Sequence, residues 1–287
     1  PLNRDQTQVL AYWRFYWPLA LIGVGMVLSV QFQNATLAKY PDAVTELAVL
    51  ALAYGVFSFF NASLQFIAQL SNVYARSPHA TRQSWRFVVL ASTLIVMPLA
   101  VIAGTHSGMA LISTIFSIDD NLTGRVGEYL VLLCPLILLN GQRHYFSGLL
   151  VQVKLTGWMT AINFIYLAVV IATLLTGLAL AMKPAYVVVG AETLGVIVML
   201  SLLLWAYYRL YEPPQRREHE TVTFRELCFF LFINFLIGFS LNSMRGELLF
   251  PQISFLKFPE LLLLMFYQCI FQLYNYFQGQ SPYLFRF

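Results

Sequence analysis

The chain has 287 residues, of which 59% are hydrophobic and only 10% are charged, against about 25% charged residues in an ordinary soluble domain. One soluble core cannot bury that much apolar surface, so the composition excludes a soluble globular protein and predicts an all-α, polytopic membrane helix bundle. The net charge of +4 is spread over the loops, which argues for a role in membrane orientation and against nucleic acid as a partner.

The apolar runs predict about eight transmembrane helices, most of them close to the roughly 20 residues that a bilayer requires. In chain order the expected spans are 18–38, 44–70, 87–103, 128–151, 158–182, 186–208, 227–241 and 259 to the C-terminus. Polar loops are expected between the second and third spans, over 75–86, and between the third and fourth, over 104–126.

The stretch EPPQRREHET is the strongest break in the pattern. Its two prolines and its charges predict an extramembrane linker over 212–222. The linker would separate a first six-helix lobe, 1–211, from the start of an incomplete second lobe, 223–287. Because only about two helices follow the linker, a truncated or misread C-terminus is expected.

Lysine and arginine are more frequent on one set of alternate loops than on the other. The N-terminus and the loops after spans two, four and six hold Arg4, Arg14, Arg76, Arg82, Arg86, Lys154, Arg209, Arg216, Arg217 and Arg225. The opposite loops hold Lys39, Arg125, Lys183, Arg245 and Lys257. Basic loops stay inside, so the N-terminus is expected in the cytoplasm and the protein in the inner or plasma membrane.

Polar residues recur at helical spacing along the second span. They are Ser58, Asn61, Gln65, Gln69 and Asn72. Steps of three and four place them on one helix face, and unpaired polar groups facing lipid are costly. The stripe therefore faces either the wall of a wet cavity or neighbouring helices through hydrogen bonds, and both interpretations stay open.

The fourth span carries a second polar face within LLNGQRHYFSGLL, formed by Asn140, Arg143, His144 and Ser147. A charge inside the membrane indicates a functional site, although Arg143 could instead extend to the cytoplasmic headgroups. If the solute is anionic, Arg143 is the residue expected to attract it. His144, beside that charge, is expected to be neutral.

Glu192 is the one acidic residue well inside a predicted span. Its position suggests a cation or proton site, or a partner for Arg143 or His144. Glu46 and Glu128 lie near the ends of spans and are expected at the interface. We therefore take the candidate cavity residues to be Asn61, Gln65, Gln69, Asn140, Arg143, His144 and Glu192.

Enzyme signatures are weak, since neither HExxH nor GxSxG occurs. No catalytic residue, metal site or cofactor is expected. Cys134, Cys228 and Cys269 lie in apolar runs without ligand spacing, which is typical of inert thiols.

Several segments together resemble the progressive ankylosis protein family. They are YWPLALIGVG, YPDAVTELAVLALAYGVFSFFN, LSNVYARS and EYLVLLCPLILLNGQRHYFSGLLVQVKLTG, within about residues 12 to 210. That family belongs with the multidrug and toxic compound extrusion (MATE) transporters. The resemblance implies a MATE-like first lobe plus a partial second lobe, a central cavity, alternating access, and anionic solutes such as pyrophosphate, citrate or nucleotide.

The chain departs from the MATE pattern in its first helix. Cation sites there use acidic residues, whereas this chain has Gln31, Gln33 and Asn34, so no cation site is carried over to this helix. The expected function is secondary export of a small, possibly anionic solute across the lipid bilayer. The alternatives are a flippase for a lipid-linked substrate and a membrane assembly subunit that does not transport.

Overall fold

The computed structural model of the chain describes residues 4–64, 66–211 and 224–230. All of them belong to a compact unit, Pro1–Phe239, while the second unit, Ser240–Phe287, lies outside the described residues. The regular structure of the described part is entirely α-helical, which confirms the all-α bundle. Six of its helical segments are long and apolar enough to cross a membrane.

The main helices follow one another with short connections. They are α1 (Arg4–Leu37), α2 (Ala43–Ala62), α3 (Ile67–Tyr74), α4 (Pro78–Gly104), α5 (His106–Phe116), α6 (Asp120–Gln152), α7 (Thr156–Ala179) and α8 (Pro184–Leu210). The expected seventh span has only its first residues in the described part, where residues 224–230 are helical. The expected eighth span, the linker over 212–222 and most of the second lobe lie outside it.

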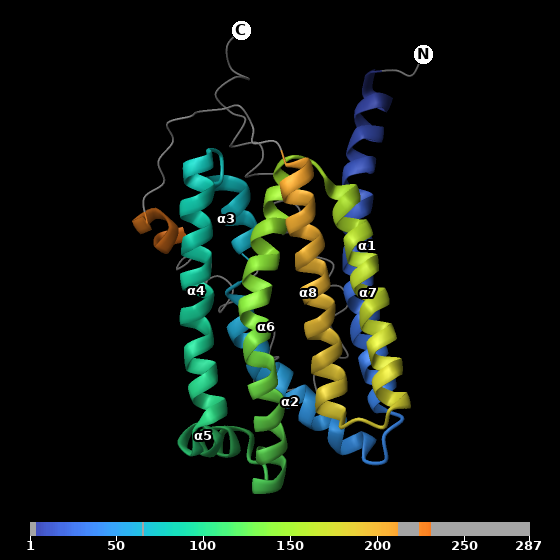
Figure 1. Ribbon diagram of the computed structural model, residues 1–287, viewed down its shortest axis with the longest axis vertical. Coiled ribbons are helices and arrows are strands. Elements are labelled where there is room, and N and C mark those ends of the chain that lie inside the picture. Colours follow the sequence, from blue (N-terminus) through green and yellow to red (C-terminus); the bar gives the residue numbers. More distant parts are fainter. Residues whose placement is uncertain (1–3, 65, 212–223, 231–287) are drawn as a thin grey trace. The chain divides into compact units, whose positions relative to one another are not determined.

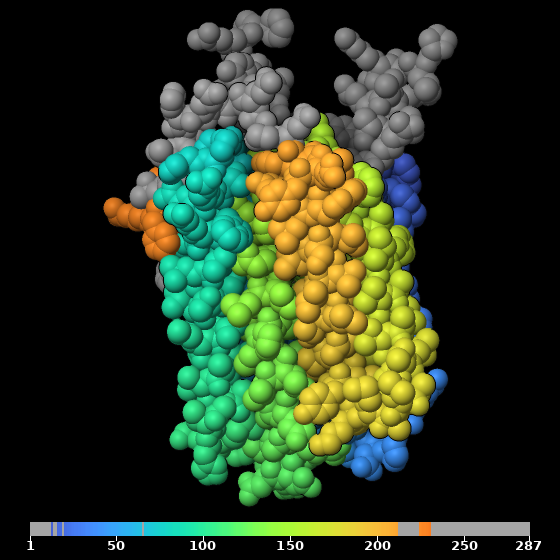
Figure 2. Space-filling model, in the orientation of Figure 1, coloured from blue at the N-terminus to red at the C-terminus, as the bar shows by residue number. Residues whose placement is uncertain are grey.

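The helix α6 lies at the centre of the unit, as Figure 1 shows between α4 and α8. It packs against α2, α3, α4 and α8, while α7 packs between α8 and α1. The surfaces of α4, α6, α8 and α7 meet along the face drawn in Figure 2. Functional side chains on α6 are therefore placed where several helices can reach them.

Burial along the helices separates an interior from an apolar outer surface. On α6 the side chains of Leu133, Leu136 and Ile137 are fully buried, whereas Leu94 and Met97 on α4 are largely exposed. Apolar side chains on the outside of a helical bundle are suited to contact with lipid tails. The chain is thus built as a membrane bundle with its packing core around α6.

The predicted loop over 75–86 is wrong, because α4 begins at Pro78. Ser77 caps this helix: its hydroxyl oxygen accepts a hydrogen bond from the backbone N–H of Ala80 at 3.1 Å. Proline follows at the first helical position, where its missing N–H costs nothing. The polar residues that suggested a loop instead form the first turns of α4, which is longer than the apolar segment 87–103 from which the span was predicted.

The predicted polar loop over 104–126 is also wrong. Thr105 caps the short apolar helix α5 by accepting a hydrogen bond from the backbone N–H of Gly108 at 3.1 Å. The helix ends at Phe116 and is followed by Ser117, which adopts a left-handed backbone conformation. The helix α6 then begins at Asp120. Only residues 117–119 connect the two helices, so the fourth span starts about two turns earlier than its apolar run indicated.

The second predicted span is interrupted rather than continuous. Its two helices, α2 and α3, are separated by residues 63–66. Two backbone hydrogen bonds span the break. The N–H of Leu64 donates to the backbone carbonyl oxygen of Asn61, and the N–H of Ile67 donates to that of Leu64, each at 3.0 Å. The polar stripe of this segment is consequently not carried on one straight helix face.

Candidate functional site

One amide pair joins the polar stripe of α2 to the polar face of α6. The Nδ2 atom of Asn140 donates to Oδ1 of Asn61 at 3.1 Å. Asn140 is buried and Asn61 is half-buried, so the bond lies between two helices and joins two predicted site residues. Of the two interpretations of the polar stripe, the contact of Asn61 matches the one in which its residues form hydrogen bonds between helices.

The remaining polar residues of the α6 face, Arg143, His144 and Ser147, are half-buried. Oδ1 of Asn140 and Nε2 of His144 are buried and have no hydrogen-bond partner among the described residues. Arg143 forms no hydrogen bond or ion pair with any of these residues either. Buried polar groups without partners are costly, so this face is suited to a polar ligand or water.

The other polar residues of the second span lie in different surroundings. Ser58 and Asn72 are exposed, and Gln69 on α3 is half-buried. Gln65 lies outside the described residues. Among the stripe residues that the structure describes, only Asn61 is bonded to the polar face of α6.

Glu192 lies on α8 and is joined to α2 by a contact that the sequence did not reveal. The hydroxyl group of Tyr54 donates to Oε2 of Glu192. Both residues are half-buried, and Glu192 lies eight residues after Pro184, at which α8 begins. That distance corresponds to roughly 12 Å along the helix axis, so the carboxyl group lies well inside the apolar segment.

Further helices present polar groups to the same carboxylate. The amide of Gln33 on α1 lies against it, and Arg143 on α6 and Tyr166 on α7 lie within electrostatic range of it. Arg143 and Glu192 do not form a direct ion pair within 4.0 Å. Glu192, Tyr54, Gln33, Tyr166 and Arg143 are called the Glu192 cluster below.

Tyr54, Gln33 and Tyr166 were absent from the predicted site. Tyrosines in apolar helices give no signal of their own, because they are common packing residues. Only Glu192, as an acidic residue inside a span, indicated where to look. The cluster it belongs to comes from four other helices, which the sequence alone does not bring together.

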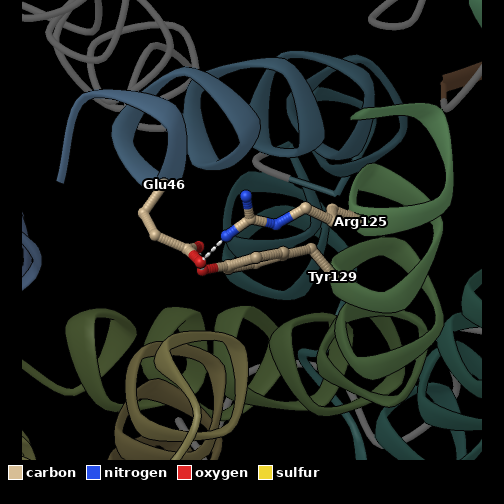
Figure 3. A network of polar contacts seen from close by, with 3 residues as sticks. All are labelled: Glu46, Arg125 and Tyr129. Atoms are coloured by element: carbon tan, nitrogen blue, oxygen red, sulfur yellow. Dashed lines mark hydrogen bonds and ion pairs between the residues drawn. The ribbon is translucent and has the colours of Figure 1, made fainter. Parts of the chain in front are cut away.

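A separate polar network joins the beginning of α2 to the beginning of α6 (Figure 3). Arg125 forms an ion pair with Oε1 of Glu46, and the hydroxyl group of Tyr129 donates to Oε2 of Glu46 at 2.9 Å. Glu46 was expected at the interface, yet its side chain is buried. Its carboxylate is satisfied by protein groups, so this network holds helices together and leaves little room for a ligand.

The comparison with protein families matches residues 4–215 to the progressive ankylosis protein (ANKH) family. No curated protein and no solved structure matches the chain. The matched range covers all helices from α1 to α8, including both polar faces and the Glu192 cluster. The chain is a multi-pass membrane protein that belongs to the progressive ankylosis protein family.

Proposed function

We propose that the chain is a secondary transporter that exports a small anionic solute by alternating access. In this proposal residues 1–211 form one lobe of the transporter and residues 223–287 begin the other, joined by a linker over 212–222. The N-terminus lies in the cytoplasm of a cell whose inner or plasma membrane holds the protein. The family membership and the six apolar helical segments support a transport protein.

The surroundings of Arg143 carry the proposal. Its guanidinium group lies on the central helix α6 and forms no hydrogen bond or ion pair with a described residue. Arginine remains charged and offers a planar fork of donors that matches carboxylate and phosphate groups. Nε2 of His144 on the same face also has no partner among the described residues. In the tautomer that carries its proton on Nε2, the ring can donate to the same anion as Arg143.

The neighbouring residues fit this ligand class. His144 in its neutral form has one ring N–H that can donate to an anion. In the proposal Asn61, Gln69 and Asn140 line the path on the side of α2 and α3, while Glu192 lies on the side of α8. The bilayer supplies the apolar surroundings that make a lone positive charge attractive to an anion.

Transport by the purified 287-residue chain in lipid vesicles tests the proposal. Vesicles loaded with pyrophosphate, citrate or nucleotide should lose the anion faster than protein-free vesicles, whereas vesicles loaded with a cation such as tetraethylammonium should not. Faster loss of the cation alone would contradict the anion assignment. If the vesicles release neither the anions nor the cation faster than protein-free vesicles do, the proposal that this chain transports such solutes is contradicted.

A flippase for a lipid-linked substrate would recognise the same phosphate chemistry by means of Arg143. The vesicle experiment separates the two functions when a short-chain, fluorescent lipid diphosphate is placed in the membrane. Movement of that lipid between leaflets without release of soluble anions would support the flippase. We expect the reverse, because Asn140 and His144, which lie beside Arg143 on α6, have buried polar atoms that face the interior rather than lipid.

A further inference from the structure

We propose that Glu192 is a proton site coupled to anion binding at Arg143, so that the protein takes up one proton when it takes up the anion. This inference rests on the proposed function for the identity of the second ligand. The proton site itself stands on the geometry of the Glu192 cluster, where five helices meet around one carboxyl group.

The carboxyl group is held by neutral partners. Tyr54 on α2 donates a hydrogen bond to it, and the amide of Gln33 on α1 lies against it. Tyr166 on α7 is also near. Amides do not titrate and tyrosines stay neutral below about pH 10, so none of these residues fixes the charge of the carboxyl group.

Arg143 on α6 is the one cation within electrostatic range of this carboxyl group among the described residues. It is not in direct contact, so it favours the ionised carboxylate from a distance while its own donors remain available. The helices that pack against α8 are α6 and α7, visible beside it in Figure 1. The groups on these two helices that influence the charge of Glu192 are Arg143 on α6 and Tyr166 on α7. Two more come from other helices, namely Gln33 on α1 and Tyr54 on α2.

An anion bound at Arg143 would favour the protonated form of Glu192 over the ionised form. Its negative charge offsets the guanidinium charge and adds a repulsion between two anions in a poorly screened environment. The carboxylate then binds a proton from the aqueous phase and becomes a neutral carboxylic acid. Tyr54 can keep its hydrogen bond by donating to the carbonyl oxygen of the acid, so the cluster need not rearrange.

Linkage makes this relation reciprocal. A proton on Glu192 strengthens anion binding by the same factor by which the anion strengthens proton binding. Two unit charges within electrostatic range in a protein interact strongly enough for a change of about tenfold or more. The anion should therefore bind about tenfold more tightly when Glu192 is protonated than when it is ionised.

Binding of inorganic pyrophosphate to the purified chain, measured by calorimetry between pH 5.5 and 8, tests the coupling. The probe changes its own ionisation over this range, so the informative quantity is the ratio of the dissociation constants of two proteins at each pH. Relative to Glu192→Gln, which mimics the protonated acid, the wild-type protein should lose about tenfold in affinity as the pH rises. A ratio that stays constant with pH would overturn the proposal.

Two further variants serve as controls. Glu128→Gln removes an exposed carboxylate on α6 and should leave the wild-type pH dependence unchanged. His144→Gln should also keep it, although it can weaken binding at every pH, because the proton is assigned to Glu192. A pH dependence that disappears with His144→Gln would overturn the assignment to Glu192.

A second measurement needs no anion. The infrared band of a protonated carboxylic acid, assigned to Glu192 by its loss in Glu192→Gln, reports the proton directly. Replacing Arg143 with Gln should shift the appearance of this band to higher pH, because the favourable cation is gone. If the band appears at the same pH in both proteins, the link between the two residues is contradicted. If the band shifts but neither the wild-type protein nor its variants bind pyrophosphate, the link is supported and the anion assignment is contradicted.

Discussion

Glu46 and Arg125 form an ion pair that joins the first turn of α2 to the second turn of α6, and Tyr129 donates to the same carboxylate. The side chain of Glu46 is 8% exposed and that of Arg125 is 31% exposed. The pair is therefore partly removed from water, where loss of one partner leaves the other charge uncompensated. Two segments that are nearly 80 positions apart in the chain are held together at this point.

The ion pair predicts a double-mutant cycle. Glu46→Gln and Arg125→Gln should each lower the free energy of unfolding by about 1–3 kcal/mol, and the double variant should lose less than the sum of both. Thermal unfolding of the purified proteins in detergent measures these changes. Arg82→Gln, at an exposed position of α4, is the control for loss of a positive charge. Strict additivity of the two losses would show that the pair contributes no coupling.

A buried hydroxyl group predicts a second effect on stability. The phenol of Tyr145 on α6 donates to the carbonyl oxygen of Thr81 at 2.6 Å and lies 2.9 Å from Oγ of Ser84, both on α4. Tyr145→Phe should cost about 1–2 kcal/mol, because it removes a buried hydrogen bond between the two helices. Tyr186→Phe, at an exposed tyrosine, should cost almost nothing in the same unfolding experiment. Equal stability of both variants would contradict a role for this bond.

Close packing between α3 and α6 predicts a difference between two glycines. A Cβ atom on Gly148 would come within 2.2 Å of the backbone oxygen of Ala68, whereas one on Gly124 would meet nothing within 4 Å. Gly148→Ala should destabilise the protein by about 1–3 kcal/mol, since backbone atoms have to move. Gly124→Ala should be neutral or stabilise by about 0.5–1 kcal/mol. A tolerated Gly148→Ala would mean that α3 and α6 are less tightly packed.

The orientation in the membrane can be tested with single cysteines. In a chain whose native cysteines are replaced, a cysteine at the exposed position His79 should react only with reagent on the cytoplasmic side, and one at the exposed Asp42 only from outside. The excess of basic residues on the side of His79 is the reason for this expectation. The opposite pattern would invert the proposed topology.

The sequence predicted the strongly apolar segments best. The fifth and sixth spans were expected over 158–182 and 186–208, and the helices run over Thr156–Ala179 and Pro184–Leu210. Errors occurred where polar residues extend a helix past its apolar run. The residues after Ser77 and those around Arg125 suggested loops, yet a capped helix start and the ion pair with Glu46 keep them helical.

The candidate site was predictable only in part. The spacing of Asn140, Arg143 and His144 indicated one polar face, and the bond between Asn140 and Asn61 brings two of the predicted residues together. The break after Ala62 could not be foreseen, because the polar stripe keeps its helical spacing across it. The contact between Tyr54 and Glu192 depends on packing between segments 138 positions apart, which no local pattern encodes.

The central claim is that Arg143 attracts the anion, and the rate of pyrophosphate efflux from vesicles measures it most directly. Compared at equal protein incorporation, Arg143→Gln should lower this rate at least about tenfold, because a desolvated charge-assisted contact is lost. Arg143→Lys should retain part of the rate, since its charge remains without the planar fork. The matched control Arg82→Gln should transport like the wild-type protein. An unchanged rate for Arg143→Gln would contradict the account and would mean that Arg143 only extends towards the lipid headgroups.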